Sequence, residues 1–328
     1  MTPVGLGLPT PPPPEGNPIS ARLVDLVRNP PAIRSECRPV RFPAQAELSL
    51  GRRALRYLLE DDLASARALY GLLGFEVVEL EQAGQRLFVA REIRGPAVRG
   101  WGLYVVNRTP RRPLLLEAPH PQHDRLTGEQ SARLMLQLGA RALIVATTHR
   151  CASKVATRCQ GRTGACRQVW GRGRYRRSDR AHITRSLFHA AHVELLEGDP
   201  GMSAVQVHGF SRRPGRRQHI IISDGTRLPG GRGSLSNRLA RAIRRRLPRR
   251  RRHLVRSCNE TSRQRLLCGT HNVQGRHANA SPDPCGRPAR RSLNRFIQIE
   301  QSIDARTPGG VIEPDMLSTA MADVWPER

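Results

Sequence analysis

Lysine is almost absent from this sequence: Lys154 is the only one among 55 lysine and arginine residues. A surface that binds phosphate normally carries both residue types, because lysine is an effective point charge for phosphate. Near-complete replacement of lysine by arginine is more typical of biased codon usage in a GC-rich genome than of a nucleic-acid-binding surface. The formal net charge of +28 remains, and it favours anionic ligands.

Aromatic residues and long apolar runs are scarce as well. Aromatic residues make up 4% of the chain, which leaves few rings on which bases could stack. No run of about 18 apolar residues occurs, so we expect no membrane span. The first residues, with prolines at 9 and 11–14, show neither the basic start nor the apolar centre of a secretory signal. We therefore expect a cytoplasmic location, although the cysteines leave the compartment open.

The seven cysteines form no Cys-x-x-Cys pair, which argues against a structural zinc knuckle. Because their number is odd, at least one stays unpaired or pairs with another chain. Three of them, Cys151, Cys159 and Cys166, lie close enough in sequence for a disulfide within one loop.

The chain divides into three regions. Residues 1–44 are rich in proline and lack periodicity, which predicts a disordered N-terminal segment. In residues 45–306, helical and strand patterns alternate, which predicts one α/β domain with a mixed, mostly parallel central sheet flanked by helices. Within it, residues 151–178 are rich in Arg, Gly and Cys and predict a long loop or lid. Residues 307–328 form a C-terminal tail without a clear role.

Two predicted helices bear on function. Residues 179–197 have helical spacing, with Ser178 or Asp179 as the N-cap. Residues 235–247 form a basic amphipathic helix, which Pro248 ends. A dense arginine run such as 244–252 usually marks a solvated helix face. Nucleic acid is therefore an alternative partner but not the favoured one.

Residues able to bind a metal follow three predicted strands. The apolar run 114–116 leads into Glu117-Ala118-Pro119-His120-Pro121-Gln122-His123-Asp124, where three potential metal ligands occur within five residues. The strand 204–207 likewise runs into His208, and the strand 296–299 runs into Glu300. Because a sheet brings the ends of neighbouring strands together, this pattern predicts one metal site.

A catalytic zinc ion needs about three protein ligands and an open position for water. His120, Asp124 and His208 meet this need, with His123 as an alternative second ligand. Glu300 ends an apolar strand, where a buried charge requires an explanation, and it is the candidate for the general base that takes a proton from water.

Several residues are candidates for binding the substrate. Arg150 follows a predicted central strand and could grip a carboxylate with two hydrogen bonds. Asn237, Arg238 and Arg306 are weaker candidates for the same task. Asp179 could line the cleft, although a helix N-cap role accounts for it equally well.

The pattern of Pro119-His120 after an apolar strand, a strand-end His208 and a late strand-end Glu300 resembles N-formylglutamate amidohydrolases. It is also similar to the wider zinc carboxypeptidase-like superfamily, which includes poly-γ-glutamate hydrolases. The resemblance covers about residues 100–306 and implies a single zinc ion held by His120, Asp124 and His208, with Glu300 as base. One departure is the spacing, because carboxypeptidases use His-x-x-Glu, and here the acid comes one residue later.

These features predict zinc-dependent hydrolysis of an amide bond in a small anionic substrate, such as an acylated or γ-linked amino acid. Two alternatives stay open: an arginine-rich nucleic-acid-binding protein without catalysis, and an inactive relative of the hydrolase family. The oligomeric state, the exact substrate and the identity of the metal do not follow from the sequence.

Overall fold

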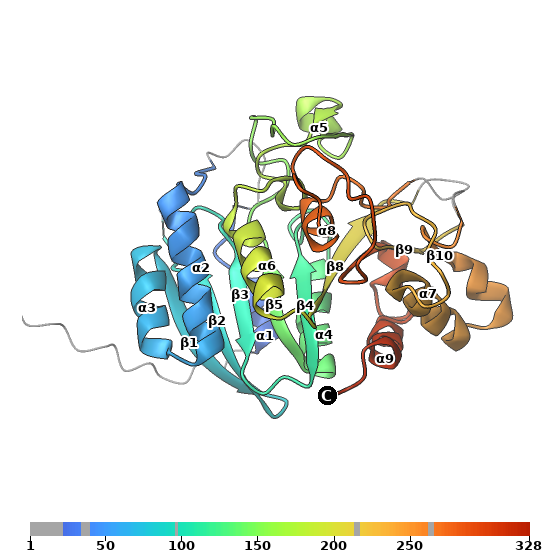
Figure 1. Ribbon diagram of the computed structural model, residues 1–328, viewed down its shortest axis with the longest axis horizontal. Helices are drawn as coiled ribbons and strands as arrows, with labels where there is room; N and C mark the ends of the chain where they lie inside the picture. Colours follow the sequence, from blue (N-terminus) through green and yellow to red (C-terminus); the bar gives the residue numbers. More distant parts are fainter. Residues whose placement is uncertain (1–21, 34–39, 96–97, 213–216, 262–265) are drawn as a thin grey trace, which may run out of the picture.

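A computed structural model describes residues 22–33, 40–95, 98–212, 217–261 and 266–328. Its centre is a nine-stranded mixed sheet (Figure 1). The strand order across the sheet is β1 (Phe75–Gln82), β2 (Gln85–Glu92), β3 (Leu103–Asn107), β5 (Ala140–Val145), β4 (Arg112–Ala118), β8 (Ser203–Phe210), β11 (Phe296–Ser302), β9 (Ile220–Ser223) and β10 (Val255–Ser257).

The middle of this sheet is parallel and its first part is an antiparallel meander. Strands β5, β4, β8 and β11 pair in parallel, whereas β1, β2 and β3 pair antiparallel with their neighbours. Beyond β11, strand β9 returns antiparallel and β10 pairs with it in parallel. The predicted mixed α/β fold is confirmed. The parallel strands include those whose carboxyl ends carry the candidate ligands.

Helices cover both faces of the sheet. One face is covered by α1 (Leu23–Arg28), α4 (Thr127–Leu138), α7 (Leu235–Arg246) and α9 (Asp315–Val324). The other face is covered by α2 (Gln45–Glu60), α3 (Leu63–Leu72) and α6 (Leu187–Gly198). Successive strand residues point to opposite faces, so Leu114 and Leu116 enter the first core and Leu115 the second. Strands buried on both faces are continuously apolar for this reason.

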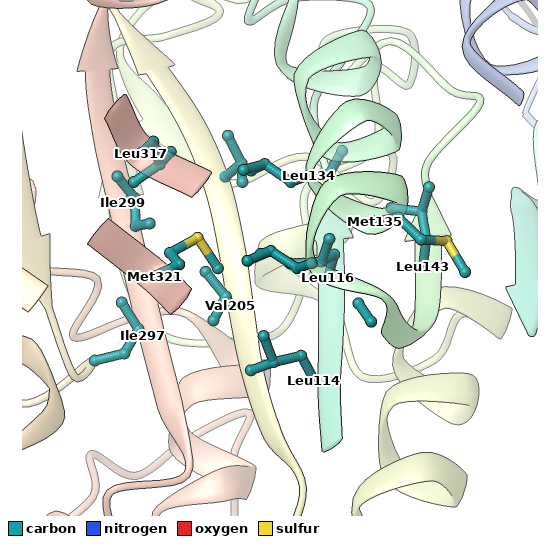
Figure 2. Close-up of a cluster of buried hydrophobic side chains, with 14 of the residues drawn as sticks. Leu114, Leu116, Leu134, Met135, Leu143, Val205, Ile297, Ile299, Leu317 and Met321 are labelled. Atoms are coloured by element: carbon teal, nitrogen blue, oxygen red, sulfur yellow. The ribbon is translucent and has the colours of Figure 1, made fainter. Parts of the chain in front are cut away.

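The C-terminal residues 307–328 are part of the core, contrary to the prediction of a tail without a role. Helix α9 packs on the first face, where Leu317 and Met321 lie beside Ile299 and Val205 (Figure 2). An amphipathic helix of only 10 residues gives a weak pattern by itself, so its role depends on the sheet that it covers.

The predicted disordered segment 1–44 is also wrong in part. Residues 23–28 form α1, where Leu23 is fully buried in the core shared with α4. Ile33 then forms an isolated bridge with Thr148. The spacing of Leu23, Leu26 and Val27 was the available signal. Residues 1–21 and 34–39 lie outside the described residues.

The predicted helix 179–197 is two elements. A short 3-10 helix, η1 (Arg180–His182), comes first, and α6 begins only at Leu187. Ser186 caps α6, because its Oγ accepts a hydrogen bond from His189 N. Asp179 therefore does not cap α6, contrary to the N-cap role that the sequence predicted for it.

Disulfides tie down the loop that follows β5. Cys151 bonds to Cys166, which confirms a disulfide within the loop, and Cys159 bonds to Cys285 in a distant segment. The loop also contains β6 (Arg162–Thr163), α5 (Arg167–Trp170) and β7 (Gly173–Arg174). A third disulfide joins Cys258 to Cys268. Disulfides are typical of oxidising compartments, so they do not support the cytoplasmic location expected from the sequence.

No helix within the described part of the chain is long and apolar enough to cross a membrane. The remaining elements are η2 (Arg249–Leu254), α8 (Val273–Ala278) and η3 (Ile303–Ala305).

Candidate metal centre

The candidate ligands meet at the carboxyl ends of the central parallel strands. His120 and Asp124 lie in the turn that follows β4, and His208 lies near the end of β8. Glu300 on β11 is the register partner of His208. Parallel strands place their carboxyl ends at one edge of the sheet, so residues 120, 208 and 300 come together despite their separation in sequence.

His120, Asp124 and His208 form a group whose ligand atoms lie within 4.8 Å of one another. Asp124 Oδ2 is 3.5 Å from His120 Nδ1 and 3.6 Å from His208 Nδ1. Two ligands of a tetrahedral zinc ion, bound at 2.0–2.2 Å, are about 3.4 Å apart. All three side chains are buried. The two distances to Asp124 Oδ2 are therefore close to the separation of two ligands on one metal ion.

The protonation state of His120 also fits a metal. Its Nε2 lies 2.7 Å from Asp179 Oδ1, and an ionised carboxylate can only accept, so Nε2 carries the proton. Its buried Nδ1 has no hydrogen-bond partner among the described residues. Such an orphaned atom costs about 1–3 kcal/mol unless something satisfies it. A cation between Nδ1 and Asp124 would do so.

Asp179 holds His120 in place, which differs from the substrate-binding role expected for it. Its Oδ1 also accepts from His182 Nδ1 at 2.7 Å. Its Oδ2 accepts two hydrogen bonds from Arg150, from Nη2 at 2.7 Å and from Nε at 3.1 Å. Burial would raise the pKa of Asp179, but Arg150 and the two histidines hold it well below its ordinary value. A carboxylate behind a ligand histidine is common in zinc sites.

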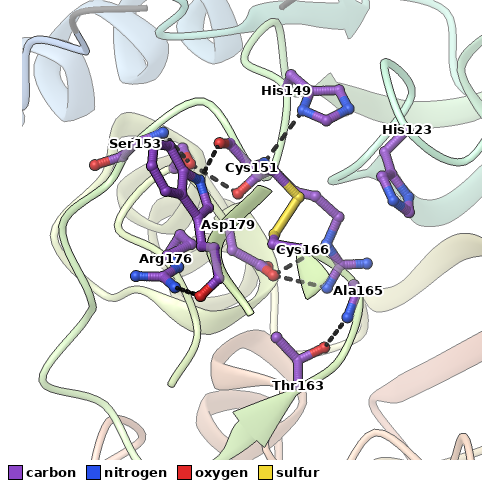
Figure 3. Close-up of a disulfide and its surroundings, with 12 residues drawn as sticks. His123, His149, Cys151, Ser153, Thr163, Ala165, Cys166, Arg176 and Asp179 are labelled. Carbon is purple, nitrogen blue, oxygen red and sulfur yellow. Dashed lines mark hydrogen bonds and ion pairs between the residues drawn. A yellow bond between two sulfur atoms is a disulfide. The ribbon is translucent and has the colours of Figure 1, made fainter. Parts of the chain in front are cut away.

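Arg150 is therefore engaged by Asp179, and its expected grip on a substrate carboxylate is not what the structure shows. The residue next to it, Cys151, is bonded to Cys166, and Asp179 lies beside this disulfide (Figure 3). The loop after β5 thus connects the disulfide to the outer layer of the candidate metal centre.

His123, the alternative second ligand, lies at the edge of the centre. Its side chain is 33% exposed, and its Nδ1 is 2.9 Å from Asp124 Oδ1. The opposite carboxylate oxygen, Oδ2, faces His120 and His208 and accepts from Gly209 N at 3.0 Å. Burial would raise the pKa of Asp124, but its electrostatic interactions with His120, His123 and His208 hold it well below its ordinary value. This arrangement favours Asp124 as the ligand and His123 as its support.

A second group, His120, Asp179 and His182, also brings three ligand atoms together. Here Asp179 Oδ1 is only 2.7 Å from each imidazole nitrogen. This is a hydrogen-bond distance, shorter than the separation of about 3.4 Å between two ligands of one tetrahedral ion. The group is better understood as the support of His120.

Glu300 has the environment of a proton acceptor. It is buried, and its Oε1 accepts from Gln298 Nε2 at 2.9 Å. Burial raises the pKa of Glu300 to about 7, with Asp124 raising it further and His208, Arg150 and the hydrogen bond opposing the shift. General bases work best with a pKa near the operating pH.

Arg306 borders the centre. Its guanidinium lies over Gly209, where a Cβ atom would collide with it, and it donates to the backbone oxygens of Ser302 and Arg125. Gly209 N in turn donates to Asp124. Among the arginines expected to bind substrate, Arg306 lies beside the candidate ligands, and it donates its hydrogen bonds to backbone oxygens.

Asn237 and Arg238 were expected to bind substrate, and the structure places them elsewhere. Arg238 Nη2 donates to Val324 O at 2.9 Å, and the next residue, Trp325, accepts from Arg112 at the start of β4. Asn237 Nδ2 donates to Gly230 O, and its Oδ1 accepts from Ser257 Oγ. Both residues therefore lie toward the opposite end of the sheet and hold loops together.

Comparison with known proteins gives a likeness to solved structures only. No family model matches the chain, and no curated protein matches it. A gene product of Agrobacterium tumefaciens matches at 12% identity with a TM-score of 0.40, over 66% of this chain and 88% of that one. A provisionally named metallopeptidase from Shewanella amazonensis SB2B matches at 12% identity with a TM-score of 0.31, over 87% and 96%. Similarities this low carry no argument about function, which rests on the centre itself.

Proposed function

We propose that this protein is a zinc-dependent hydrolase that cleaves an amide bond in a small anionic substrate. The observation that carries the proposal is the convergence of His120 Nδ1, Asp124 Oδ2 and His208 Nδ1, in which the His120 atom is buried without a partner. When bound, zinc would lower the pKa of a water molecule and polarise the carbonyl of the substrate.

Glu300 would take the proton. Its Oε1 is occupied by the hydrogen bond from Gln298, so Oε2 is the oxygen proposed to receive the proton and pass it to the leaving nitrogen. In the metal-free protein the pKa of Glu300 is raised to about 7, which would let this carboxyl group accept a proton and return it near neutral pH. Asp124 has a lowered pKa and stays ionised, which suits a ligand.

The substrate is proposed to be an acylated or γ-linked amino acid. Arg306 lies beside the ligands and would bind its carboxylate, since a guanidinium can donate two hydrogen bonds to it. The net charge of +28 would increase the encounter rate with any anionic substrate.

Activity and metal content together test the proposal. Protein loaded with zinc should hydrolyse N-acyl or γ-glutamyl amino acids, lose activity to a chelator and regain it with added zinc. Glu300→Gln should reduce kcat by about 10²–10⁴-fold without changing zinc content. Glu81→Gln, on the exposed surface of the edge strand β1, is the matched control. Zinc bound without activity on any such substrate would identify an inactive relative.

Binding to nucleic acid is less well supported. In the arginine run, Arg244 is paired with Glu260 and Arg246 with Asp323. Arg176, in the Gly- and Arg-rich loop, donates to the backbone oxygens of Lys154 and Trp170. These arginines serve the protein's own structure, and no second function is proposed from them.

A further inference from the structure

A layer of buried amide side chains lies beneath the candidate metal centre. On β8, Gln206 is two residues before His208, and on β11, Gln298 is two residues before Glu300. The strands are in register, so Gln206 faces Gln298 and His208 faces Glu300. Residues two apart in a strand point to the same face. Each proposed functional residue therefore stands over a buried glutamine.

Asn272 joins the two glutamines. It is the N-cap of α8, and its Oδ1 accepts from Gln274 N and Gly275 N, both at 3.0 Å. Backbone N–H groups can only donate, so the orientation of this amide is fixed. Its Nδ2 consequently faces the sheet and donates to Oε1 of both Gln206 and Gln298, the latter at 3.1 Å.

The orientation of the Asn272 amide determines that of Gln206 and Gln298, and thereby the hydrogen bonds of His208 and Glu300. Because Gln298 Oε1 faces Asn272, its Nε2 donates to Glu300 Oε1 at 2.9 Å. Because Gln206 presents Oε1, its contact with His208 Nε2 at 2.7 Å requires a proton on that nitrogen. In the neutral imidazole, His208 Nδ1 is then the unprotonated nitrogen, and it lies 3.6 Å from Asp124 Oδ2.

Glu117 holds the other end of Gln206. This carboxylate is fully buried on β4, and its Oε2 accepts from Gln206 Nε2 at 3.0 Å. Its Oε1 is 2.9 Å from His192 Nδ1. A carboxylate cannot donate, so it reinforces the same orientation of the Gln206 amide.

We propose that Asn272 is a positioning residue, which through Gln206 selects the metal-binding tautomer of His208 and through Gln298 orients the carboxylate of Glu300. Its effect on metal affinity rests on the proposed function, whereas its effect on the tautomer does not. Histidine ligands of metals depend in the same way on the partner of their second nitrogen.

Asn272→Asp separates this role from helix capping. Asp caps a helix about as well as Asn, so a residue that only caps α8 would tolerate the change. The variant removes both donated hydrogen bonds and places a carboxylate against two amide oxygens. Gln298 should therefore reverse, and Gln206, which would lie between this carboxylate and Glu117, should lose its fixed orientation. We expect His208 to lose its Nε2–H tautomer and zinc affinity to fall by about 10–100-fold.

Two further variants calibrate the result. Asn272→Ser keeps the cap and removes the donors without adding charge, so Glu117 should still hold Gln206 and the loss should be smaller. Asp62→Asn changes a cap between carboxylate and amide at the start of α3, where Asp62 accepts from Ser65 N, and should leave zinc affinity unchanged. Thermal melting of each variant checks that it is folded.

Two measurements are needed. Long-range ¹H–¹⁵N NMR of the imidazole groups reports the His208 tautomer in metal-free protein, and competition with a chromogenic chelator gives the zinc affinity. Wild-type tautomer and affinity in folded Asn272→Asp would overturn the inference. If the wild-type protein bound no zinc, the proposed function would fail, and the tautomer measurement would still decide the inference. If Asn272→Asp does not fold, the zinc affinity of Asn272→Ser decides it, and an affinity equal to that of wild type would overturn the inference.

Discussion

The two ends of the central sheet use polar side chains in opposite ways. Toward the amino ends of the central strands, Asn237 and Arg238 form hydrogen bonds with protein groups such as Gly230 O, Ser257 Oγ and Val324 O. At the carboxyl ends, His120 Nδ1 is buried without a partner among the described residues. This atom lies beside Asp124 and His208, which makes the carboxyl ends of the strands the candidate site for a bound cation. Residue type alone does not distinguish these two ends.

The carboxyl groups of the candidate centre also differ among themselves. Hydrogen bonds and ion pairs hold the pKa values of Asp124 and Asp179 well below 3.8 despite burial. Glu300 has weaker compensation, and burial raises its pKa to about 7. Environments that separate the pKa values of neighbouring groups suit them to different tasks, and for Glu300 the proposed task is proton transfer.

The largest effect should come from comparing two variants. One removes a proposed ligand at the carboxyl ends of the parallel strands, and the other removes a structural residue toward the opposite end of the sheet. His208→Ala should weaken zinc binding by more than about 100-fold, since losing even an outer partner costs about 10–100-fold. Asn237→Ala should leave zinc affinity unchanged and lower the free energy of unfolding by about 1–3 kcal/mol, because Ser257 Oγ and Gly230 O lose a partner. Isothermal titration and denaturant unfolding measure the two quantities. Equal zinc affinities in the two variants would contradict the proposed difference between the two ends of the sheet.

A smaller effect should follow from weakening the support of a ligand. Asp179→Asn keeps the shape of the side chain but removes the charge that fixes the His120 Nε2 proton and pairs with Arg150. Zinc affinity should fall by about 10–100-fold. Asp323→Asn, which removes the same charge from a surface pair with Arg246, is the control and should have no effect. A zinc affinity within twofold of wild type in Asp179→Asn would show that His120 needs no carboxylate.

A third effect concerns stability and pH in metal-free protein. The folded-state pKa of Glu300 is raised from 4.5 to about 7, so its protonated form stabilises the fold at low pH, and this contribution is lost as the pH rises from 4.5 to 7. Glu300→Gln mimics the protonated form. The variant should equal wild type near pH 4.5 and exceed it by about 3 kcal/mol above pH 7.

Comparing the two proteins at each pH is necessary because buried histidines act in the opposite direction. Burial lowers the pKa values of His149, His182 and His277 to about 4, so the stability they contribute is lost as the pH falls. These groups are common to both proteins and cancel in the difference. Urea unfolding with chelator present, from pH 4.5 to 8, gives that difference. A constant value across this range would show that Glu300 does not titrate there.

Local patterns in the sequence were sufficient for much of the fold. The apolar spacing of residues 127–138 and the glycine at 139 are typical of a helix and its end, and α4 ends there with Gly139 at a positive φ. The apolar runs before His120, His208 and Glu300 predicted strands, and parallel strands bring their carboxyl ends together. The candidate residues His120, His208 and Glu300 could be named from sequence because each lies within two residues of the end of such a strand.

Only the tertiary structure decided which polar residues support those ligands and which serve elsewhere. Asp179 reaches His120 across 59 residues, Asn272 reaches Gln206 across 66, and neither pairing has a local pattern. Arg150 and Arg238 look alike in the sequence, yet one pairs with a buried carboxylate and the other with a backbone oxygen. Periodicity is a property of the chain and can be read from it, whereas the partner of a buried polar atom depends on which distant segments the folded sheet brings within hydrogen-bond distance.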